Sequence, residues 1–341
     1  MKKMALIGVS VLTAGLLLGR SEAASYAVSR SAPVPGDGGW DLLACDAQAR
    51  RLYVSHSEQT QVLDIDALKV VGSIAETHGV HGIALAPDLG RGYISAGKDN
   101  QVVVFDLKSL KILSRVRAGT NPDVVVYDPA TLRVFAFNGR SQDVTVMDAK
   151  TFQAVVTLPL GGKPEFAVAD GRGKLFVNLE DKSQLLEVNT RALAITNRWP
   201  LAPCEEPSAL AMDASSGRLF AACGNKTLVV VNGADGKVVA QLPIGDHVDG
   251  AVFDASTKRV FSSNGDGTIT VIQEDSPDAY RVIQTVPTQP GARTIALDPS
   301  TGRLFLPVAK LGPPPAPTAR QPRPRPSIVP ATFQILVVSP S

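Results

Sequence analysis

The sequence contains few aromatic residues, few cysteines and few histidines. Only 5 % of its 341 residues are Phe, Tyr or Trp, which argues against the stacking platforms that bind single-stranded nucleic acids. The formal net charge is +2, so the chain has no strong overall attraction for DNA. Hydrophobic residues reach 44 %, which is enough for a folded core and too many for a disordered chain.

The usual short motifs of catalysis are also absent. HExxH, CxxC, GxSxG and the P-loop do not occur, so metalloprotease, thiol-redox, serine-hydrolase and nucleotide-hydrolysing activities have no local support. No stretch of roughly 10 to 15 residues shows helical spacing, which excludes alternating βαβ units. The sequence therefore predicts an all-β protein without a standard catalytic signature.

The first 23 residues have the layout of a secretory signal peptide. Lys2 and Lys3 precede an apolar run from Ala5 to Leu18, and small residues near Ala23 offer a cleavage site. The run has about 14 residues, whereas a membrane anchor needs roughly 20. We expect a periplasmic or secreted mature chain, residues 24–341, with no membrane span and with a formal charge close to zero.

The rest of the chain is one unit repeated seven times. Each unit begins with a short apolar segment that ends at an anchor residue, and a tight turn leads into a second segment with an aromatic residue. The anchors lie 40 to 44 residues apart, at Asp46, Ala86, Asp128, Asp170, Asp213, Asp254 and Asp298. An all-β period of this length is typical of propeller blades.

We predict a seven-bladed β-propeller of four-stranded antiparallel blades, formed by residues 24–341 as a single domain. The last unit ends after its third strand, near residues 334–338, while a strand-like segment at 26–30 precedes the first unit. Pairing these two segments would complete the seventh blade and leave no open edge. A Pro-rich insertion at 312–330 interrupts the last blade, either as a solvated loop or as a docking segment for a partner.

The second segment of the units resembles a known repeat. Tyr53-Val-Ser-His56, with looser copies at 93–96, 135–138 and 261–264, is similar to the YVTN-type repeat of secreted bacterial YncE-like propellers. The resemblance covers residues 26–341 and includes the Pro-rich insertion. It implies a propeller fold and export but no particular activity, because such propellers are mostly uncharacterised or serve as binding platforms.

Polar residues gather at the start of the first strands. Five residues before each anchor lies a position that we call a ring residue, because radial symmetry would bring all seven to one mouth of the central channel. The ring residues are Asp41, His81, Asp123, Glu165, Ser208, Asp249 and Arg293. Their expected hairpin partners at the same mouth are His56, Ala96, Asn138, Leu179, Cys223, Asn264 and Val308.

Two kinds of site are open to such a ring. Asp41 with His56 and His81, and with His78 nearby, could hold a divalent metal ion or exchange protons. The rest of the mouth is rich in oxygen ligands, which suit a hard cation such as calcium or a polar ligand: Asp123, Asn138, Glu165, Asp249 and Asn264. A merely solvated rim and a protein-binding face are the alternatives.

The three cysteines fall into two groups. Cys204 and Cys223 lie in one unit near the predicted mouth, and an oxidising compartment would favour a disulfide between them. Two free thiols that bind a soft metal such as copper are the alternative. We expect Cys45 to be a small buried residue of the first strand.

Two classes of function fit these observations. The first is an exported binding or scaffold protein that takes a protein, peptide or small ligand at the channel mouth. The second is an enzyme of lactonase or metal-assisted hydrolase type, in which Arg293 would hold a substrate carboxylate. We favour the binding protein, because the chain has no catalytic motif.

Overall fold

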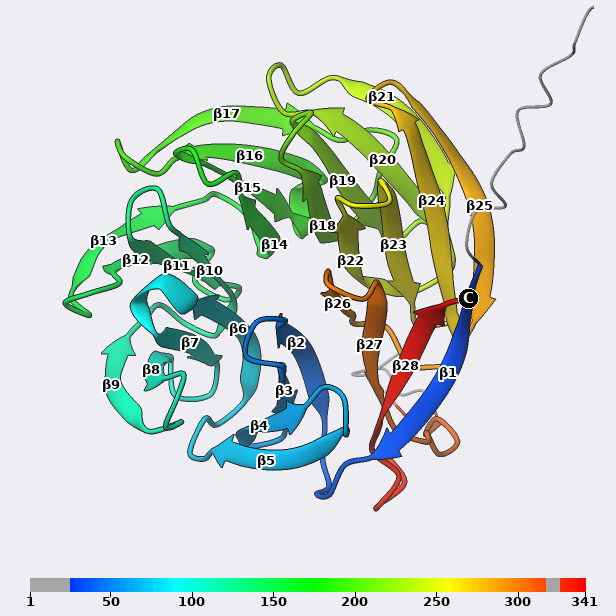
Figure 1. Cartoon of the computed structure of the whole chain (residues 1–341). Coiled ribbons are helices and arrows are strands. Elements are labelled where there is room, and N and C mark those ends of the chain that lie inside the picture. Colours follow the sequence, from blue (N-terminus) through cyan, green and yellow to red (C-terminus); the bar gives the residue numbers. More distant parts are fainter. Residues whose placement is uncertain (1–24, 317–325) are drawn as a thin grey trace, which may run out of the picture.

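A seven-bladed β-propeller is formed by the described part of the chain, residues 25–316 and 326–341 of a computed structural model (Figure 1). Each blade is a four-stranded antiparallel sheet, as the repeat predicts. The predicted signal peptide and the middle of the Pro-rich insertion lie outside the described residues. Within those ranges, no helix is long and apolar enough to cross a membrane.

Six blades use four consecutive strands, of which the first lies nearest the axis (Figure 1). Blade 1 consists of β2 (Trp40–Asp46), β3 (Arg51–His56), β4 (Gln59–Asp64) and β5 (Lys69–Ile74). Blade 2 consists of β6 (Val80–Ala86), β7 (Arg91–Ala96), β8 (Gln101–Asp106) and β9 (Ile112–Arg117). Blade 3 consists of β10 (Pro122–Asp128), β11 (Arg133–Asn138), β12 (Asp143–Asp148) and β13 (Ala154–Pro159).

The next three blades follow the same order. Blade 4 consists of β14 (Pro164–Ala169), β15 (Lys174–Leu179), β16 (Gln184–Asn189) and β17 (Ala194–Pro200). Blade 5 consists of β18 (Pro207–Asp213), β19 (Arg218–Cys223), β20 (Thr227–Asn232) and β21 (Val238–Pro243). Blade 6 consists of β22 (Val248–Asp254), β23 (Arg259–Asn264), β24 (Thr268–Ser276) and β25 (Ala279–Pro287). In the described ranges, helical structure is confined to two short 3₁₀ turns, η1 (Pro87–Leu89) and η2 (Glu180–Lys182).

The seventh blade joins the two ends of the chain. It contains β26 (Ala296–Asp298), β27 (Arg303–Val308), β28 (Gln334–Pro340) and, outermost, β1 (Tyr26–Pro33). β1 runs antiparallel to β28 along nearly its whole length, and Figure 1 shows the blue and the red strand side by side. The predicted ring closure is confirmed, and it leaves no unpaired seam between the first and last blades.

The aromatic residue of each second strand is a core residue of its blade. Each occupies the third position of the strand and is 0–1 % exposed: Tyr53, Tyr93, Phe135, Phe176, Phe220, Phe261 and Phe305. Full burial of one such ring contributes about 1.5–3 kcal/mol. The same apolar position repeated in seven strands explains why the period is visible in the sequence.

Anchor aspartates fold the turn between the first two strands. The Oδ1 atom of Asp213 accepts from the amide of Ser215 at 2.9 Å, and its Oδ2 atom accepts from the hydroxyl of Ser216 at 2.7 Å. Asp254 and Asp298 hold their turns in the same way. Such local bonds reverse the chain and fix where the first strand ends.

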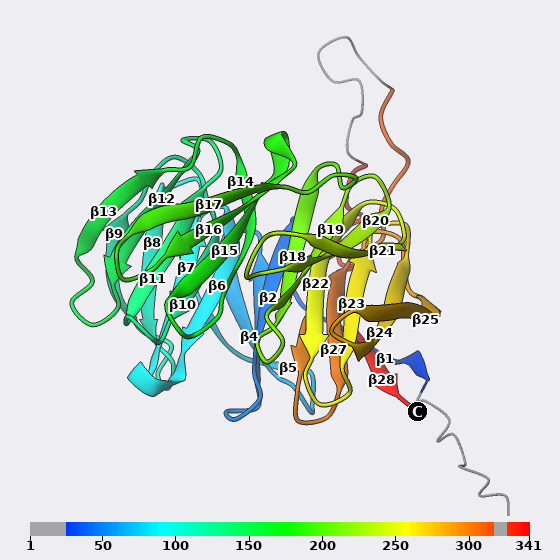
Figure 2. The ribbon, with the colours of Figure 1, turned by 90° about the horizontal axis from the view of Figure 1, so that it is seen from above.

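The Pro-rich insertion follows β27, the second strand of its blade. Its base is a short antiparallel pairing of Leu311 with Ile328, and its described ends project from the body of the propeller (Figure 2). In the other blades the second strand ends opposite the start of the first strand. If blade 7 has the same geometry, the insertion starts from the face of the propeller that carries the ring residues.

Candidate binding site at the channel mouth

One end of the central channel opens into a polar cavity of about 450 Å³. All seven ring residues line it, although they are spread over the chain from Asp41 to Arg293. Each stands at the start of the innermost strand of its blade or just before it. The radial repeat is thus what brings these side chains to a common cavity.

This cavity is acidic. Two permanent cations, Lys163 and Arg293, and two histidines are among the described residues that line it. Seven carboxyl side chains also line it: Asp41, Asp123, Glu165, Glu180, Glu206, Asp246 and Asp249. Above about pH 8, where all seven carboxyls are ionised, and with the histidines neutral, the lining has an excess of five negative charges. A recessed field of one sign concentrates cations and repels anions.

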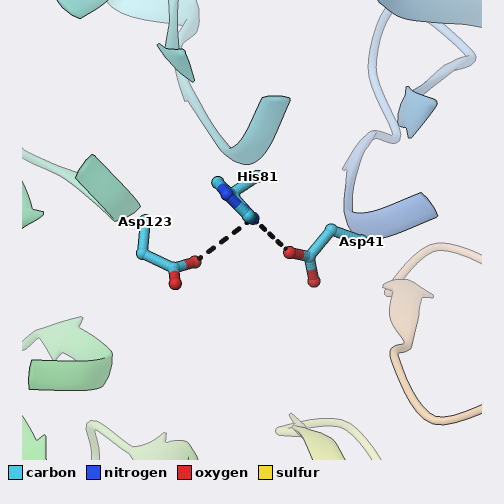
Figure 3. A group of neighbouring side chains, drawn as sticks. All are labelled: Asp41, His81 and Asp123. Atoms are coloured by element: carbon cyan, nitrogen blue, oxygen red, sulfur yellow. Dashed lines mark hydrogen bonds and ion pairs between the residues drawn. The ribbon is translucent and has the colours of Figure 1, made fainter. Parts of the chain in front are cut away.

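Three neighbouring blades bring Asp41, His81 and Asp123 together, and the side chains point toward one another (Figure 3). The Nδ1 atom of His81 lies 2.6 Å from Oδ2 of Asp41 and 3.8 Å from Oδ1 of Asp123. Burial lowers the pKa of His81, but the bond to Asp41 and the charge of Asp123 outweigh it, so this pKa is raised. Burial raises the pKa of Asp123 to about 6 although His81 opposes the shift.

The other side of the ring contains two ion-paired groups. Lys163 contacts the carboxylates of both Glu165 and Glu180, and Nε of Arg293 lies 2.8 Å from Oδ2 of Asp249. Burial, reinforced by the charge of Asp123, raises the pKa of Glu165 to about 8. Burial also raises the pKa of Asp249 to about 7, despite Arg293. Burial is thus the main cause of both raised pKa values, and the neighbouring carboxylates add to it.

Buried hydroxyl groups hold the backbone of the first three ring residues. Each donor belongs to the preceding blade and is fully buried, and each acceptor is a ring-residue carbonyl. The pairs are Thr294 with Asp41, Ser55 with His81 and Ser95 with Asp123. Because the donors are anchored in strands or beside them, these ring positions are fixed before any ligand arrives.

Three of the predicted site residues lie elsewhere. The residue before the ring residue takes the pairing position, so that Trp40 lies opposite His56, Pro122 opposite Asn138 and Val248 opposite Asn264. A β-bulge follows in each of these first strands, and a shift of one residue turns a side chain to the other face. The prediction that His56, Asn138 and Asn264 face the channel mouth is therefore wrong; all three are buried and none lines the cavity.

His56 consequently does not join the predicted metal ligands. In the described ranges, the group whose ligand atoms lie within 4.8 Å of one another consists of Asp41, His81 and Asp123. The Nδ1 atom of His56 instead lies 2.8 Å from Oε1 of Gln61, and its ring stacks on Phe333 with centroids 3.9 Å apart. Phe333 follows the Pro-rich insertion, so His56 anchors the returning chain.

Sequence reasoning missed several cavity residues that enter from the loops before the first strands. Lys163, Glu206 and His247 each lie two positions before a ring residue. Glu206 and His247 have φ values of 51° and 56°, in the left-handed region, where the equivalent positions of blades 2 and 3 have Gly79 and Asn121. Glycine and asparagine are the usual residues in that conformation. The sequence could have indicated these three residues, because they are charged or titratable and lie at a fixed offset from the ring residue of their unit. Glu180, on η2, also lines the cavity, but nothing in the repeat marks its position.

A disulfide joins Cys204 to Cys223, with Cα atoms 5.6 Å apart. It connects the loop that enters blade 5 to the end of β19, so the structure favours the predicted disulfide over two free thiols that bind a metal. Glu206 follows two residues after Cys204 and lines the cavity, which places the covalent link beside the mouth. Cys45 is unpaired and half-buried, and burial raises the pKa of its thiol to about 12.

Comparisons with known proteins support the fold alone. No protein-family model matches the sequence, and no curated protein matches it. A chain of Kuenenia stuttgartiensis hydrazine synthase is 15 % identical, with a TM-score of 0.70 over 80 % of this chain and 94 % of that chain. A structure of U3-55K is 8 % identical, with a TM-score of 0.73 over 92 % and 99 %. A chain of the mitotic checkpoint complex is 16 % identical, with a TM-score of 0.73 over 96 % and 99 %.

Identities this low establish architecture and leave activity open. The fold and the comparisons together define the chain as a seven-bladed β-propeller.

Proposed function

We propose that the protein is an exported, YncE-like propeller that binds a positively charged ligand at its acidic channel mouth. The observation that carries this proposal is the excess of carboxyl groups over permanent cations around one cavity. A cation that enters would interact favourably with several crowded carboxylates at once, whereas an anion would be repelled. The YVTN-like motifs and the signal-peptide layout support the export part of the proposal.

The size and rigidity of the cavity limit the kind of ligand. A volume of about 450 Å³ suits a small organic cation or one basic side chain of a peptide or protein partner. The buried hydroxyl bonds to the ring backbone mean that little ordering is needed on binding, which favours affinity.

A metal-assisted hydrolase is the second candidate, and the contact between Asp41 and His81 is the observation that favours it. A carboxylate that orients an imidazole can serve acid–base chemistry. However, the hydroxyl of Ser208, a possible nucleophile in the ring, donates to the carbonyl of Val248 at 2.7 Å, so its proton is directed at a backbone carbonyl rather than at a base. We therefore prefer binding to catalysis.

Calorimetry with small charged probes tests the binding proposal. Spermidine and a trilysine peptide should bind the purified chain at low ionic strength, and citrate and triglutamate should not. Added salt should weaken binding, because the Debye length falls from about 10 Å at 0.1 M to about 3 Å at 1 M. At pH 9, where both carboxyls are ionised, the double variant Glu165→Gln/Asp249→Asn should bind trilysine at least about tenfold more weakly than the wild type.

A matched control removes a carboxylate far from the channel. Asp275 pairs with Arg281 on an exposed part of blade 6, so Asp275→Asn should leave probe binding unchanged. Equal binding of cationic and anionic probes, or full binding by the double ring variant, would overturn the proposal.

A further inference from the structure

We propose that the channel mouth binds a divalent first-row transition-metal ion, such as Mn²⁺, Co²⁺ or Zn²⁺, through Asp41, His81 and Asp123. This inference rests on the proposed function, because it names the class of cation that the acidic mouth takes. It assigns the metal to three neighbouring ring residues.

The donor atoms are close enough to share one ion. The three ligand atoms lie within 4.8 Å of one another, with 2.6 Å and 3.8 Å separating Nδ1 of His81 from the two carboxylates. Metal bonds of 2.0–2.2 Å place neighbouring ligand atoms about 2.8–3.6 Å apart, from octahedral to tetrahedral geometry. On metal binding the Asp41 oxygen would move away from Nδ1 of His81 and the Asp123 oxygen would move toward it, each by less than about 1 Å.

The type of ligand selects the class of ion. An imidazole nitrogen favours zinc, cobalt and related metals over magnesium and calcium, while carboxylates also accept manganese. The two carboxylates of Asp41 and Asp123 balance the charge of a divalent ion. With three protein ligands, the remaining coordination positions would face the cavity, where water or a ligand could occupy them.

The surroundings of the three residues also indicate a built site. Their carbonyl groups are held by buried hydroxyls from the preceding blades, so the side chains start from fixed positions. Gly97 leaves room for the imidazole, because a Cβ atom there would lie 2.9 Å from Cδ2 and 3.0 Å from Nε2 of His81. Fixed ligands lose less freedom on metal binding than mobile ones.

Metal titration of the full chain after chelation tests the site. Calorimetry with MnCl₂, CoCl₂ and ZnCl₂ should show one bound ion per chain, and cobalt should give a visible absorption band. His81→Ala and Asp123→Asn should weaken binding by about 100-fold or more and remove the cobalt band. Asp249→Asn, which removes only a more distant ring charge, should weaken binding by less than about tenfold, and Asp275→Asn should have no effect.

His81→Gln, which retains more of the side-chain volume, guards against misfolding of His81→Ala, and far-UV circular dichroism checks both variants. Metal binding lost in both variants, with the circular dichroism spectrum of the wild type retained, would support the site. Metal binding that is absent below 1 mM, or unchanged in His81→Gln, would overturn this inference, and the amine titrations would then decide the proposed function separately. If neither metals nor amines bind, both proposals are wrong.

Discussion

Gln284, in the outer strand of blade 6, binds both backbone groups of Tyr26 in blade 7. Its Oε1 atom accepts from the amide of Tyr26 at 2.8 Å, and its Nε2 atom donates to the carbonyl of the same residue at 2.8 Å. The ring of Tyr26 also packs edge-on against Phe261, with centroids 4.9 Å apart. The N-terminal strand is therefore attached to β28 in its own blade and also to blade 6. The side chain of Gln284 supplies two hydrogen bonds of the attachment to blade 6.

The first prediction concerns this attachment. Gln284→Ala leaves the amide and the carbonyl of Tyr26 without their side-chain partner, and we expect it to lower the free energy of unfolding by about 1–3 kcal/mol. Urea unfolding followed by circular dichroism measures the change. Gln241, exposed on the outer strand of blade 5, gives the control variant Gln241→Ala, which should change stability by less than about 0.5 kcal/mol. Equal effects of the two variants would contradict the role of Gln284.

A second prediction concerns the disulfide, which links residues 19 positions apart. Replacing both Cys204 and Cys223 with Ala should lower the free energy of unfolding by about 3 kcal/mol, because the unfolded chain regains the freedom of an open loop. Urea unfolding of the double variant tests this value. Thiol titration of the denatured wild-type chain should find one reactive group, Cys45, before reduction and three afterwards. Three reactive thiols without a reductant would show that the disulfide does not form.

Features that recur in every unit made the fold predictable. The buried aromatic of the second strand and the turn-forming aspartates repeat because each blade must solve the same packing problem. The number of residues from anchor to ring position is constant for the same reason. Asp41, His81 and Asp123 could therefore be assigned to one mouth from spacing alone, although 82 residues separate the first from the last.

Local backbone geometry was not predictable in the same way. The bulge near the start of the first strand shifts the pairing of Trp40 and His56 by one residue, and no residue type in the segment marks it. Since successive side chains in a strand point to opposite faces, this single shift moves His56 from the channel into the core. Glu180 was missed for a related reason, since among the described residues a 3₁₀ turn follows the second strand in blade 4 alone.

The third prediction tests the structural role of His56. His56→Ala removes the stack on Phe333 and the bond to Gln61, and should lower the free energy of unfolding by roughly 2 kcal/mol at pH 7. It should leave metal and amine affinity unchanged, because His56 does not line the cavity. Calorimetry and urea unfolding of the same preparation provide the two readings. If the folded variant binds cations much more weakly than the wild type, His56 contributes to the binding site after all.

The pKa of His56 gives this prediction a direction with pH. Burial lowers this pKa, against the effects of Gln61 and Asp37, so the folded chain keeps the imidazole neutral where the unfolded chain is already protonated. The unfolded state then binds more protons, and wild-type stability falls as the pH drops below about 6.5. The His56→Ala variant has no imidazole at this position, so its stability does not fall with pH for this reason. Its deficit relative to the wild type should therefore shrink between pH 7 and pH 5.

The last prediction concerns Glu165, whose pKa is raised to about 8 by burial and the charge of Asp123. Between about pH 4.5 and 8 the unfolded chain has released this proton while the folded chain retains it, so stability falls as the pH rises through that range. Glu165→Gln resembles the protonated form. It should equal the wild type near pH 4 and exceed it by about 2 kcal/mol at pH 9, a value reduced for solvent screening. Urea unfolding at both pH values measures this, with the exposed Glu76→Gln as a control that should show no such trend. A variant less stable than the wild type at pH 9 would mean that the ion pair with Lys163 outweighs the burial of the carboxylate.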